Sequence, residues 1–322
     1  MTRIVVVGSL NRDYVCHVDR LPGPGETRLG GELALFSGGK GGNQAVAAAA
    51  VGSVTGHPCS LLGSVGDDED GRALLDDLRR AGVDVGEVVV AAQVRTGAAL
   101  ITVSADGENT IVVAPGANHA VTEEEVRDAL GRLLHPTDVV VAQAELPRGV
   151  VELAVREAAA RGARAVLNLA PFTPVSDDVL ALCDPLVVNE SEAAGLLRES
   201  VEGLPGARRA AVTLAGTARS AVVTLGGAGA VVATGAGCTH VPAPRVDVVD
   251  STGAGDAFTG ALAVALAAGR DLVSATRCGV AVASYSVRGA GAQASYPRGD
   301  ECARLLRETE EQTGLAGDGI FL

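Results

Sequence analysis

Short runs of β-branched and aliphatic residues alternate along the chain with longer stretches rich in alanine, leucine and arginine. The short runs are apolar throughout, which is typical of strands buried on both faces of a parallel sheet. The longer stretches have helical periodicity. We therefore expect strands at 4–7, 60–65, 139–142, 165–168, 186–188 and 220–224, and helices at 69–81, 123–134, 150–161 and 254–268. This order predicts an α/β fold whose mainly parallel sheet has helices on both faces.

Two segments interrupt this alternation. Residues 13–36 and 94–114 have extended patterns broken by the turn signals PGPGE and ADGEN, and they contain no helical period. We expect them to pair into a small separate sheet that branches from the main domain. The last nine residues, GLAGDGIFL, have no periodicity, so we expect a loose tail at 314–322 after a domain that spans 1–313.

The composition excludes several classes of partner. The chain has 322 residues, of which 47% are hydrophobic but only 2% aromatic, so aliphatic side chains must build a large core. Few aromatic residues leave no platform on which bases of single-stranded nucleic acid could stack. A net charge of −13 argues against DNA, RNA or an anionic membrane as the main partner. An acidic protein that binds phosphate needs a local binding device.

The six cysteines form no CxxC pair and the five histidines no HExxH motif, which favours free thiols in a reducing cytosol over a metal site. The apolar run in MTRIVVVGSLNRD is too short for a signal peptide. Residues 43–66 carry no charge, but glycines and a proline interrupt them, so a helix, a turn and a strand explain them better than a membrane span. We expect a cytoplasmic protein.

Three glycine-rich stretches are candidates for a phosphate site, and none has a common nucleotide motif. Gly41 follows Lys40, so GxxxxGK[ST] is absent, and the first strand continues into an extended segment without GxGxxG. The stretch GDDEDG at 66–71 begins with glycine where a calcium loop needs a ligand, and we interpret it as an acidic helix start.

The stretch VVDSTGAGDAFTG at 248–260 is more informative. Gly253, Ala254 and Gly255 present backbone N–H groups at a helix N-terminus, where an anion is stabilised without a basic side chain. Asp256 stands beside this position, where a catalyst needs a base. An aspartate in the first helical turn also stabilises the helix dipole by ~0.3–1 kcal/mol. Taken alone, the pattern does not decide between the two interpretations.

A second stretch, SGGKGGNQAVAAAA at 37–50, also opens a helix of small residues with a glycine-rich turn. Together the two stretches resemble the PfkB or ribokinase family of sugar kinases. The resemblance runs from about residue 3 to 300 and includes SLNRD at 9–13, PGET at 24–27, TG at 96–97, DGEN at 106–109, PGAN at 115–118, LNLAP at 167–171, NESEA at 189–193, TLGGAG at 224–229 and GAGAQAS at 289–295.

The resemblance implies a three-layer α/β/α sandwich with a small β lid formed by about 13–36 and 94–114. It also implies that a sugar hydroxymethyl oxygen attacks the γ-phosphate of ATP, with Mg²⁺ present. Asp256 matches the general base of the family, and Gly253, Ala254 and Gly255 match the anion hole. The combination of GGKGGNQA and NxD favours D-ribose, phosphorylated at O5.

The family's sugar-binding positions can be assigned residue by residue. Asn11 and Asp13 match the pair that binds the vicinal hydroxyls of the sugar, and Glu145 matches an acid that contacts it. The second wall of the sugar site and the lid hinge match Gly39, Lys40, Gly41, Gly42 and Asn43. Gly42 stands where the family more often has alanine.

The resemblance also implies positions for ATP and for cations. Asn189 and Glu192 match an NxxE pair that positions phosphate and magnesium-bound water, although the same spacing is typical of a capping box. The ATP loop and adenine contacts match Thr224, Leu225, Gly226, Gly227, Ala228, Gly229, Gly255 and Val280, the last standing where asparagine is frequent. A potassium site matches Asp250, Thr252, Ser286, Gly289, Gly291 and Ser295.

Other functions remain open at this point. A nucleoside, fructose or ketodeoxygluconate kinase would share these motifs, and a sugar or nucleotide sensor would share the fold. Asp256 and NESE argue against a sensor, which needs no base. A dehydrogenase is the weakest alternative because the Rossmann glycine pattern is absent. The resemblance also implies a homodimer formed through the β lids, with sugar and ATP as small-molecule partners.

Overall fold

The computed structural model describes residues 1–311. Nine strands form the larger sheet, in the order β13-β12-β11-β10-β9-β8-β1-β4-β5. Their bounds are β1 Ile4–Val7, β4 Cys59–Gly66, β5 Asp84–Ala91, β8 Val139–Gln143, β9 Arg164–Asn168, β10 Leu186–Asn189, β11 Ser220–Thr224, β12 Ala230–Thr234 and β13 Gly237–Val241. β12 pairs antiparallel with both β11 and β13, and the other pairs are parallel, so the sheet is mainly parallel, as expected.

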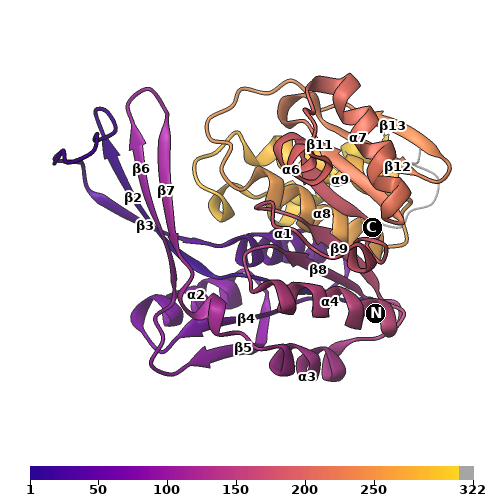
Figure 1. Ribbon diagram of the computed structural model, residues 1–322, viewed down its shortest axis with the longest axis horizontal. Helices are drawn as coiled ribbons and strands as arrows, with labels where there is room; N and C mark the ends of the chain where they lie inside the picture. Colours follow the sequence, from indigo (N-terminus) through magenta and orange to yellow (C-terminus); the bar gives the residue numbers. More distant parts are fainter. Residues whose placement is uncertain (312–322) are drawn as a thin grey trace.

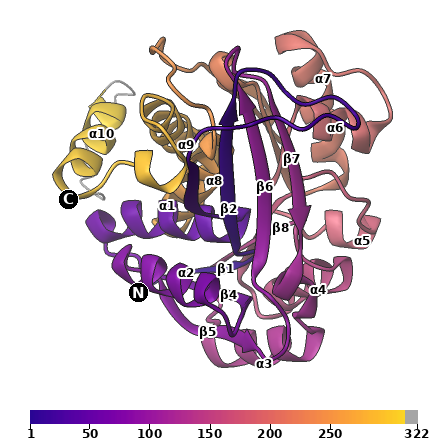
Figure 2. The same cartoon turned by 90° about the vertical axis from the view of Figure 1, so that its left-hand side faces the viewer.

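Two hydrophobic cores lie on opposite faces of this sheet. Alternate residues of one strand belong to different cores, because successive side chains point to opposite faces: Ile4 and Val6 contact one core, and Val5 and Val7 contact the other. The first core is covered by α1 Lys40–Thr55, α2 Glu69–Arg80, α8 Ala254–Ala267, α9 Leu272–Ser286 and α10 Gly299–Glu311. The second is covered by α3 Glu123–Leu133, α4 Arg148–Ala160, α5 Asp177–Leu180, α6 Glu190–Leu197 and α7 Gly203–Thr217. Figure 2 shows the two helix layers on either side of the strands, which confirms the α/β/α sandwich.

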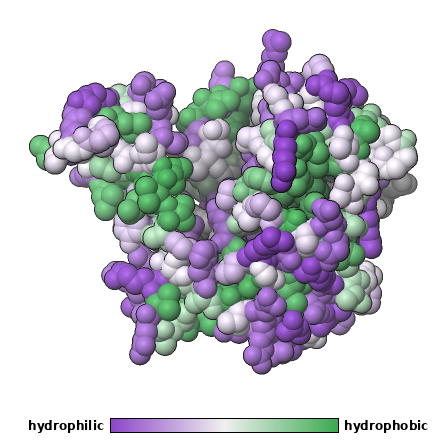
Figure 3. All heavy atoms as spheres, viewed as in Figure 1, coloured by the Kyte–Doolittle hydropathy of each residue, from purple (hydrophilic) through white to green (hydrophobic). Residues whose placement is uncertain are grey.

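The expected small sheet is also present. It consists of β2 Asn11–Val18, β3 Leu33–Gly38, β6 Gly97–Ser104 and β7 Asn109–Ala114, in the order β3-β2-β6-β7. We call this sheet the lid. It projects from the main body at the left of Figure 1, and Figure 3 shows hydrophobic side chains on it and a hollow between it and the body. The tail expected at 314–322 lies outside the described residues.

The strand order reverses its direction of winding beside β1. From β1 the chain passes to β4 and β5 on one side, and it later returns to β8 on the other side. Ligands bind in such sheets at the carboxyl ends of the strands, where the direction of winding reverses. β1 ends next to Gly8 and Ser9, and β8 ends next to Glu145. No helix within residues 1–311 is both long and apolar enough to cross a bilayer.

Candidate active site

Asp256 lies in the first turn of α8 and is buried. Its Oδ2 accepts a hydrogen bond from Asn43 Nδ2 at 3.0 Å, and its Oδ1 accepts one from Gln44 Nε2 at 2.9 Å. Burial raises the pKa of Asp256 above 3.8, although Lys40 and the two amide donors act in the opposite direction. The first turn of α1 therefore fixes the carboxylate, and burial makes it a stronger proton acceptor than an exposed aspartate.

The turn before Asp256 requires its glycines for two different reasons. Gly253 has φ 74°, and a Cβ there would lie 2.5 Å from Ala292 Cβ. A Cβ at Gly255 would meet no protein atom within 4 Å, so this glycine leaves space open. Ala254 N–H donates to Ser251 O at 3.2 Å, while the first N–H groups of a helix have no acceptor inside the helix. The turn can therefore present backbone N–H groups to an anion.

A cavity of about 220 Å³ adjoins this turn. It is lined by Lys40, Asn168, Ala170, Val187, Asn189, Glu192, Thr224, Gly253, Gly255, Asp256 and Thr259. Burial alone would lower the pKa of Lys40, but Asp256, Glu145 and Glu192 outweigh it and raise the pKa. Lys40, which the sequence assigns to the sugar wall, thus shares a cavity with residues assigned to phosphate and magnesium.

The pair Asn11 and Asp13 lies at the start of β2, where the lid leaves the body. Asn118 Nδ2 donates to Asn11 Oδ1 at 2.8 Å and Asn118 Oδ1 accepts from Leu10 N–H at 2.8 Å, so a buried amide orients Asn11. Burial raises the pKa of Asp13 to about 7, assisted by the negative charge of Glu145. Asp13 is therefore a carboxylate that gains from hydroxyl donors in a bound ligand.

Glu145 has a structural role that its loop position does not reveal. Its Oε2 accepts hydrogen bonds from Ser9 Oγ at 2.5 Å and from Lys40 N–H at 3.0 Å. An acid at this place satisfies a free N–H group of α1 and interacts favourably with the helix dipole. Glu145 thus joins the carboxyl ends of β1 and β8 to the helix that holds Asp256.

The glycines of the SGGKGG turn allow the backbone of α1 to approach β1. Gly39 has φ 81° and joins β3 of the lid to α1. A Cβ at Gly41 would lie 2.4 Å from the carbonyl carbon of Gly8, whereas a Cβ at Gly42 would first meet Leu10 Cδ2 at 3.2 Å. Gly41 is therefore required by a backbone contact, and Gly42 is not.

We expect Gly41→Ala to lower the free energy of unfolding by ~1–3 kcal/mol, the usual effect of overpacking, because two backbone segments must separate. Gly42→Ala is the matched control. It should change stability by less than about 1 kcal/mol, because the flexible Leu10 side chain can move and alanine favours a helix. Urea unfolding of both variants checks this. Equal losses in the two variants would contradict the role assigned to the Gly8–Gly41 contact.

The residues assigned to ATP do not share one cavity. Asn189 and Glu192 form a capping box at α6: Asn189 Oδ1 accepts Glu192 N–H at 2.8 Å, and Glu192 Oε2 accepts Asn189 N–H at 2.8 Å. They line the smaller cavity together with Thr224. Val280 instead lines a larger cavity of about 590 Å³ that borders α9 and α10. The 3-10 turn Gly226–Ala228, with Leu225 and Gly229 at its ends, follows β11.

The residues assigned to potassium lie in the loop before α8, at the end of α9 and in the segment that follows α9. Asp250 Oδ1 accepts Thr252 N–H at 2.9 Å, and its Oδ2 accepts Gly291 N–H at 2.8 Å. The Tyr296 hydroxyl donates to Gly253 O at 3.0 Å. The remaining assigned residues are Ser286, Gly289 and Ser295. The Ser286 hydroxyl donates to Ala283 O, and the Ser295 hydroxyl donates to Ala292 O. These loops therefore contact the anion turn directly.

Several buried amides of the site do not follow from the sequence reasoning. Gln143 Nε2 donates to Gln44 Oε1 at 2.7 Å, and Gln44 Nε2 donates both to Asp256 and to Asn168 Oδ1. Gln293 Nε2 donates to Asn43 Oδ1 at 3.0 Å. A glutamine side chain inside a motif of otherwise small, apolar residues is the signal that could have identified them. Within residues 1–311, no three His, Cys, Asp or Glu side chains group as metal ligands.

Known proteins with similar sequences and structures are carbohydrate kinases. Residues 1–298 match the pfkB family of carbohydrate kinases. The ribokinase of Bacillus subtilis is 35% identical over 306 residues, 95% of this chain and 100% of that protein, and a deoxyribokinase of Salmonella typhi is 34% identical over 296 residues, 91% and 95% of the two chains. The structure of Arabidopsis thaliana ribokinase with ribose and ATP superposes with a TM-score of 0.84 at 30% identity, covering 95% of this chain and 99% of that one. The chain therefore belongs to the PfkB family of carbohydrate kinases and is an ATP-dependent sugar kinase.

Proposed function

We propose that this kinase phosphorylates D-ribose at O5. The observation that carries the proposal is the buried carboxylate of Asp256, which lies at a helix N-terminus and in one cavity with Lys40 and Glu192. Asp13 is close enough to Asp256 for the two charges to repel. A sugar held by Asn11 and Asp13 would thus lie beside the base.

In the proposed reaction, Asp256 accepts the proton of the O5 hydroxyl as O5 attacks the γ-phosphorus of ATP. A bond forms between O5 and phosphorus, the bond from phosphorus to the bridging oxygen breaks, and ADP leaves. The N–H groups of Gly253 and Gly255 and the Lys40 ammonium stabilise the charge on the transferred phosphoryl group, whereas Ala254 N–H, which also matches the anion hole, already donates to Ser251 O. Such a reaction depends mainly on positioning and on fixed electrostatics.

The donors in the smaller cavity suit magnesium. Asp256, Glu192 and the nearby Glu145 all act on the charge of Lys40, so carboxylates outnumber the one ammonium group. A magnesium ion that accompanies ATP would neutralise this excess and the phosphates together. We propose that Glu192 holds a magnesium-bound water and that Asn189 and Thr224 contact phosphate oxygens, with the base of ATP in the larger cavity beside Val280.

We expect potassium to activate the enzyme and sodium to do so poorly. Oxygen donors of Asp250, Thr252, Ser286 at the end of α9 and the loop around Gly291 suit a monovalent cation, which would order the anion turn through the contacts described above. Rates in potassium, sodium and tetramethylammonium chloride, at equal ionic strength and saturating magnesium, provide the test. Equal rates in all three salts would remove the cation site from the proposal.

The choice of sugar is tested with a coupled ADP-release assay over a panel of sugars and nucleosides. We expect kcat/KM to be higher for D-ribose than for 2-deoxyribose by roughly fivefold or more, because a missing hydroxyl leaves the half-buried Asp13 without a donor. Asp13→Ala should lower both values and narrow the gap. The deoxyribokinase among the relatives makes this pair of sugars the sharpest comparison.

The panel also separates the alternatives. A preference for a nucleoside, fructose or ketodeoxygluconate over ribose by roughly tenfold would replace the ribose assignment while leaving the kinase assignment in place. Binding of sugar and ATP without ADP release would instead favour a sensor.

We further propose a homodimer that pairs through the lids, in the cytoplasm. The lid exposes Leu33, Leu35, Phe36, Leu100, Ile111, Val112 and Val113. These residues lie on both faces of the lid, and Leu35, Leu100 and Val112 share one face. Exposed apolar side chains grouped in this way are typical of an interface between proteins. Light scattering tests the dimer. All six cysteines are free, which suits a reducing compartment.

A further inference from the structure

Arg12 lies between the two residues assigned to the sugar but points away from them. It follows Asn11 and precedes Asp13 on β2, and side chains alternate between the two faces of a strand. On the face of Arg12, the Tyr14 hydroxyl donates to Asp70 Oδ2 at 2.5 Å. Asp70 belongs to α2, so this face of the lid is directed toward a helix of the main body.

Two carboxylates of α2 surround the Arg12 guanidinium. Arg12 Nε lies 3.7 Å from Asp70 Oδ1, and Arg12 Nη1 lies 3.9 Å from Asp77 Oδ2. Nη1 also donates at 3.3 Å to Ser37 Oγ on β3, and that hydroxyl donates to Asp77 Oδ2 at 2.5 Å. Arg12 thereby connects two lid strands to α2. We call Arg12, Ser37, Asp70 and Asp77 the clasp.

The clasp is incompletely formed in this arrangement of the lid. Arg12 Nε is buried and has no hydrogen-bond partner within residues 1–311, and both ion pairs are longer than hydrogen bonds. A buried unpaired donor is unfavourable, so a small movement that closes the 3.7 Å gap to Asp70 would be favoured.

The other connection of α2 to the lid is complete. Asp68, which caps α2, accepts hydrogen bonds from Thr96 N–H at 2.9 Å and from Thr96 Oγ1 at 2.6 Å, directly before β6. Thr96 Oγ1 in turn accepts Gly66 N–H at 2.9 Å. The lid is therefore joined to α2 in two regions: at Thr96, and through Tyr14, Ser37 and Arg12, where the two contacts of Arg12 with α2 are the long ones.

We propose that Arg12 is a positioning residue for the sugar site: its contact with Asp70 and Asp77 sets the angle of the lid and thereby the places of Asn11 and Asp13. The inference rests on the proposed function for the role of those two residues. Because Arg12 is joined to both of them through one strand, any shift of the lid relative to α2 moves them together. Asp256 and the nucleotide residues lie on other elements, outside the lid.

The kinetic test compares Arg12→Gln, Asp70→Asn and the double variant. We expect each single change to raise KM for ribose by about fivefold or more and to leave kcat within about twofold of wild type. This pattern is expected of residues that act on a site through a shared contact. KM for ribose in the double variant should be no higher than the higher of the two single-variant values. Arg12→Lys should raise KM for ribose less than Arg12→Gln does, because lysine retains the positive charge but lacks the planar guanidinium group.

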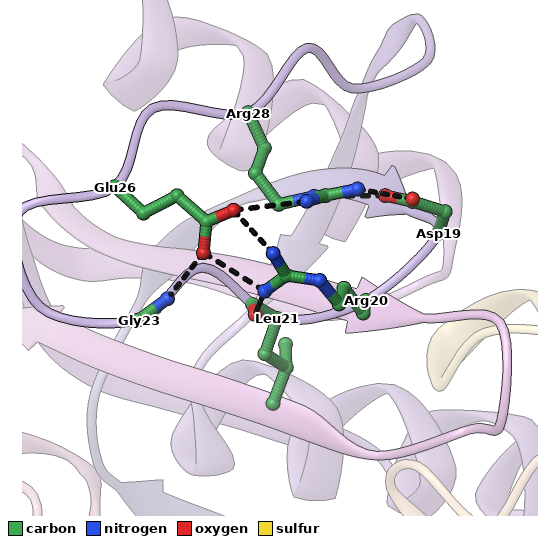
Figure 4. Close-up of polar contacts among 6 residues, drawn as sticks. All are labelled: Asp19, Arg20, Leu21, Gly23, Glu26 and Arg28. Carbon is green, nitrogen blue, oxygen red and sulfur yellow. Dashed lines mark hydrogen bonds and ion pairs between the residues drawn. The ribbon is translucent and has the colours of Figure 1, made fainter.

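Arg28→Gln is the matched control, because Arg28 also belongs to the lid and also pairs with two carboxylates. It contacts Asp19 and Glu26 inside the loop between β2 and β3, as Figure 4 shows, and no residue of α2. If general loosening of the lid were sufficient, Arg28→Gln would raise KM as Arg12→Gln does. We expect it to leave KM for ribose within about twofold.

Amide hydrogen exchange of the ligand-free protein tests the clasp without a substrate. Arg12→Gln and Asp70→Asn should both speed exchange in β2 and β3 relative to wild type, and Arg28→Gln should not. This measurement decides the inference even if another sugar proves to be the acceptor, and if Arg12→Gln fails to fold, Asp70→Asn alone carries the same expectation. Unchanged exchange and unchanged KM in Asp70→Asn, or additive effects in the double variant, would overturn the inference.

Discussion

Asp256→Asn is expected to lower kcat by ~10²–10⁴, the usual contribution of a positioned general base. The amide cannot accept the O5 proton, whereas the carboxylate, with its pKa raised by burial, can. Affinities for ribose and ATP should stay within a few-fold, because the anion turn and the residues around Asn11 are unchanged. Turnover numbers and calorimetric binding constants for both ligands provide the measurement.

Folding must be separated from catalysis in this variant. Asn43 and Gln44 both present amide N–H groups to Asp256, so one of them would face the new amide nitrogen. A thermal melt reports any loss of stability from that contact. Asp177→Asn, on the exposed start of α5, is the control for preparation and assay. If Asp256→Asn retained turnover within a few-fold of wild type, Asp256 would not be the base.

The main architecture could be predicted because it depends on local patterns. Apolar strands such as Ile4–Val7 and capped helices such as Glu69–Arg80 can be predicted from a few neighbouring residues. The edge strand β5, Asp84–Ala91, was not identified, because its pattern is only partly apolar and it has one neighbour in the sheet. The lid sheet was expected from 13 onward, yet it begins at Asn11, since pairing with Gly38 and Gly97 extends the strand.

The candidate site was only partly accessible to sequence reasoning. Motif positions such as Asp256 and Asn11 can be assigned from the resemblance, but their orientation depends on partners that are distant in sequence. Gln44 and Asp256 are 212 residues apart, and Asn118 and Asn11 are 107 apart. The contacts of Arg12 with α2 are of the same kind, because no local pattern around SLNRD indicates an acidic partner at Asp70.

Replacing Asp13 by asparagine is expected to stabilise the ligand-free protein, and to do so more at pH 8 than at pH 5. The pKa of Asp13 rises from 3.8 to about 7 on folding, chiefly through burial. Between these values the folded protein binds a proton that the unfolded chain has lost, so this group makes stability fall as pH increases. A difference of about three pKa units corresponds to at most about 4 kcal/mol, reached above pH 7.

Urea unfolding of wild type and Asp13→Asn at pH 5, 6, 7 and 8 measures this linkage. The difference in unfolding free energy should grow steadily in favour of the variant up to about pH 7, the pKa of Asp13, and then level off. Asp178→Asn is the control: a hydrogen bond from Arg156 lowers the pKa of this exposed carboxyl below 3.8, so it is ionised in both states and its effect on stability should stay constant from pH 5 to 8. A saturating concentration of ribose should reduce the advantage of Asp13→Asn, because hydroxyl donors favour the charged carboxylate that the variant lacks. A pH-independent difference between wild type and Asp13→Asn would contradict the prediction. It would show that folding does not raise the pKa of Asp13 and that the carboxylate is well solvated in the folded protein.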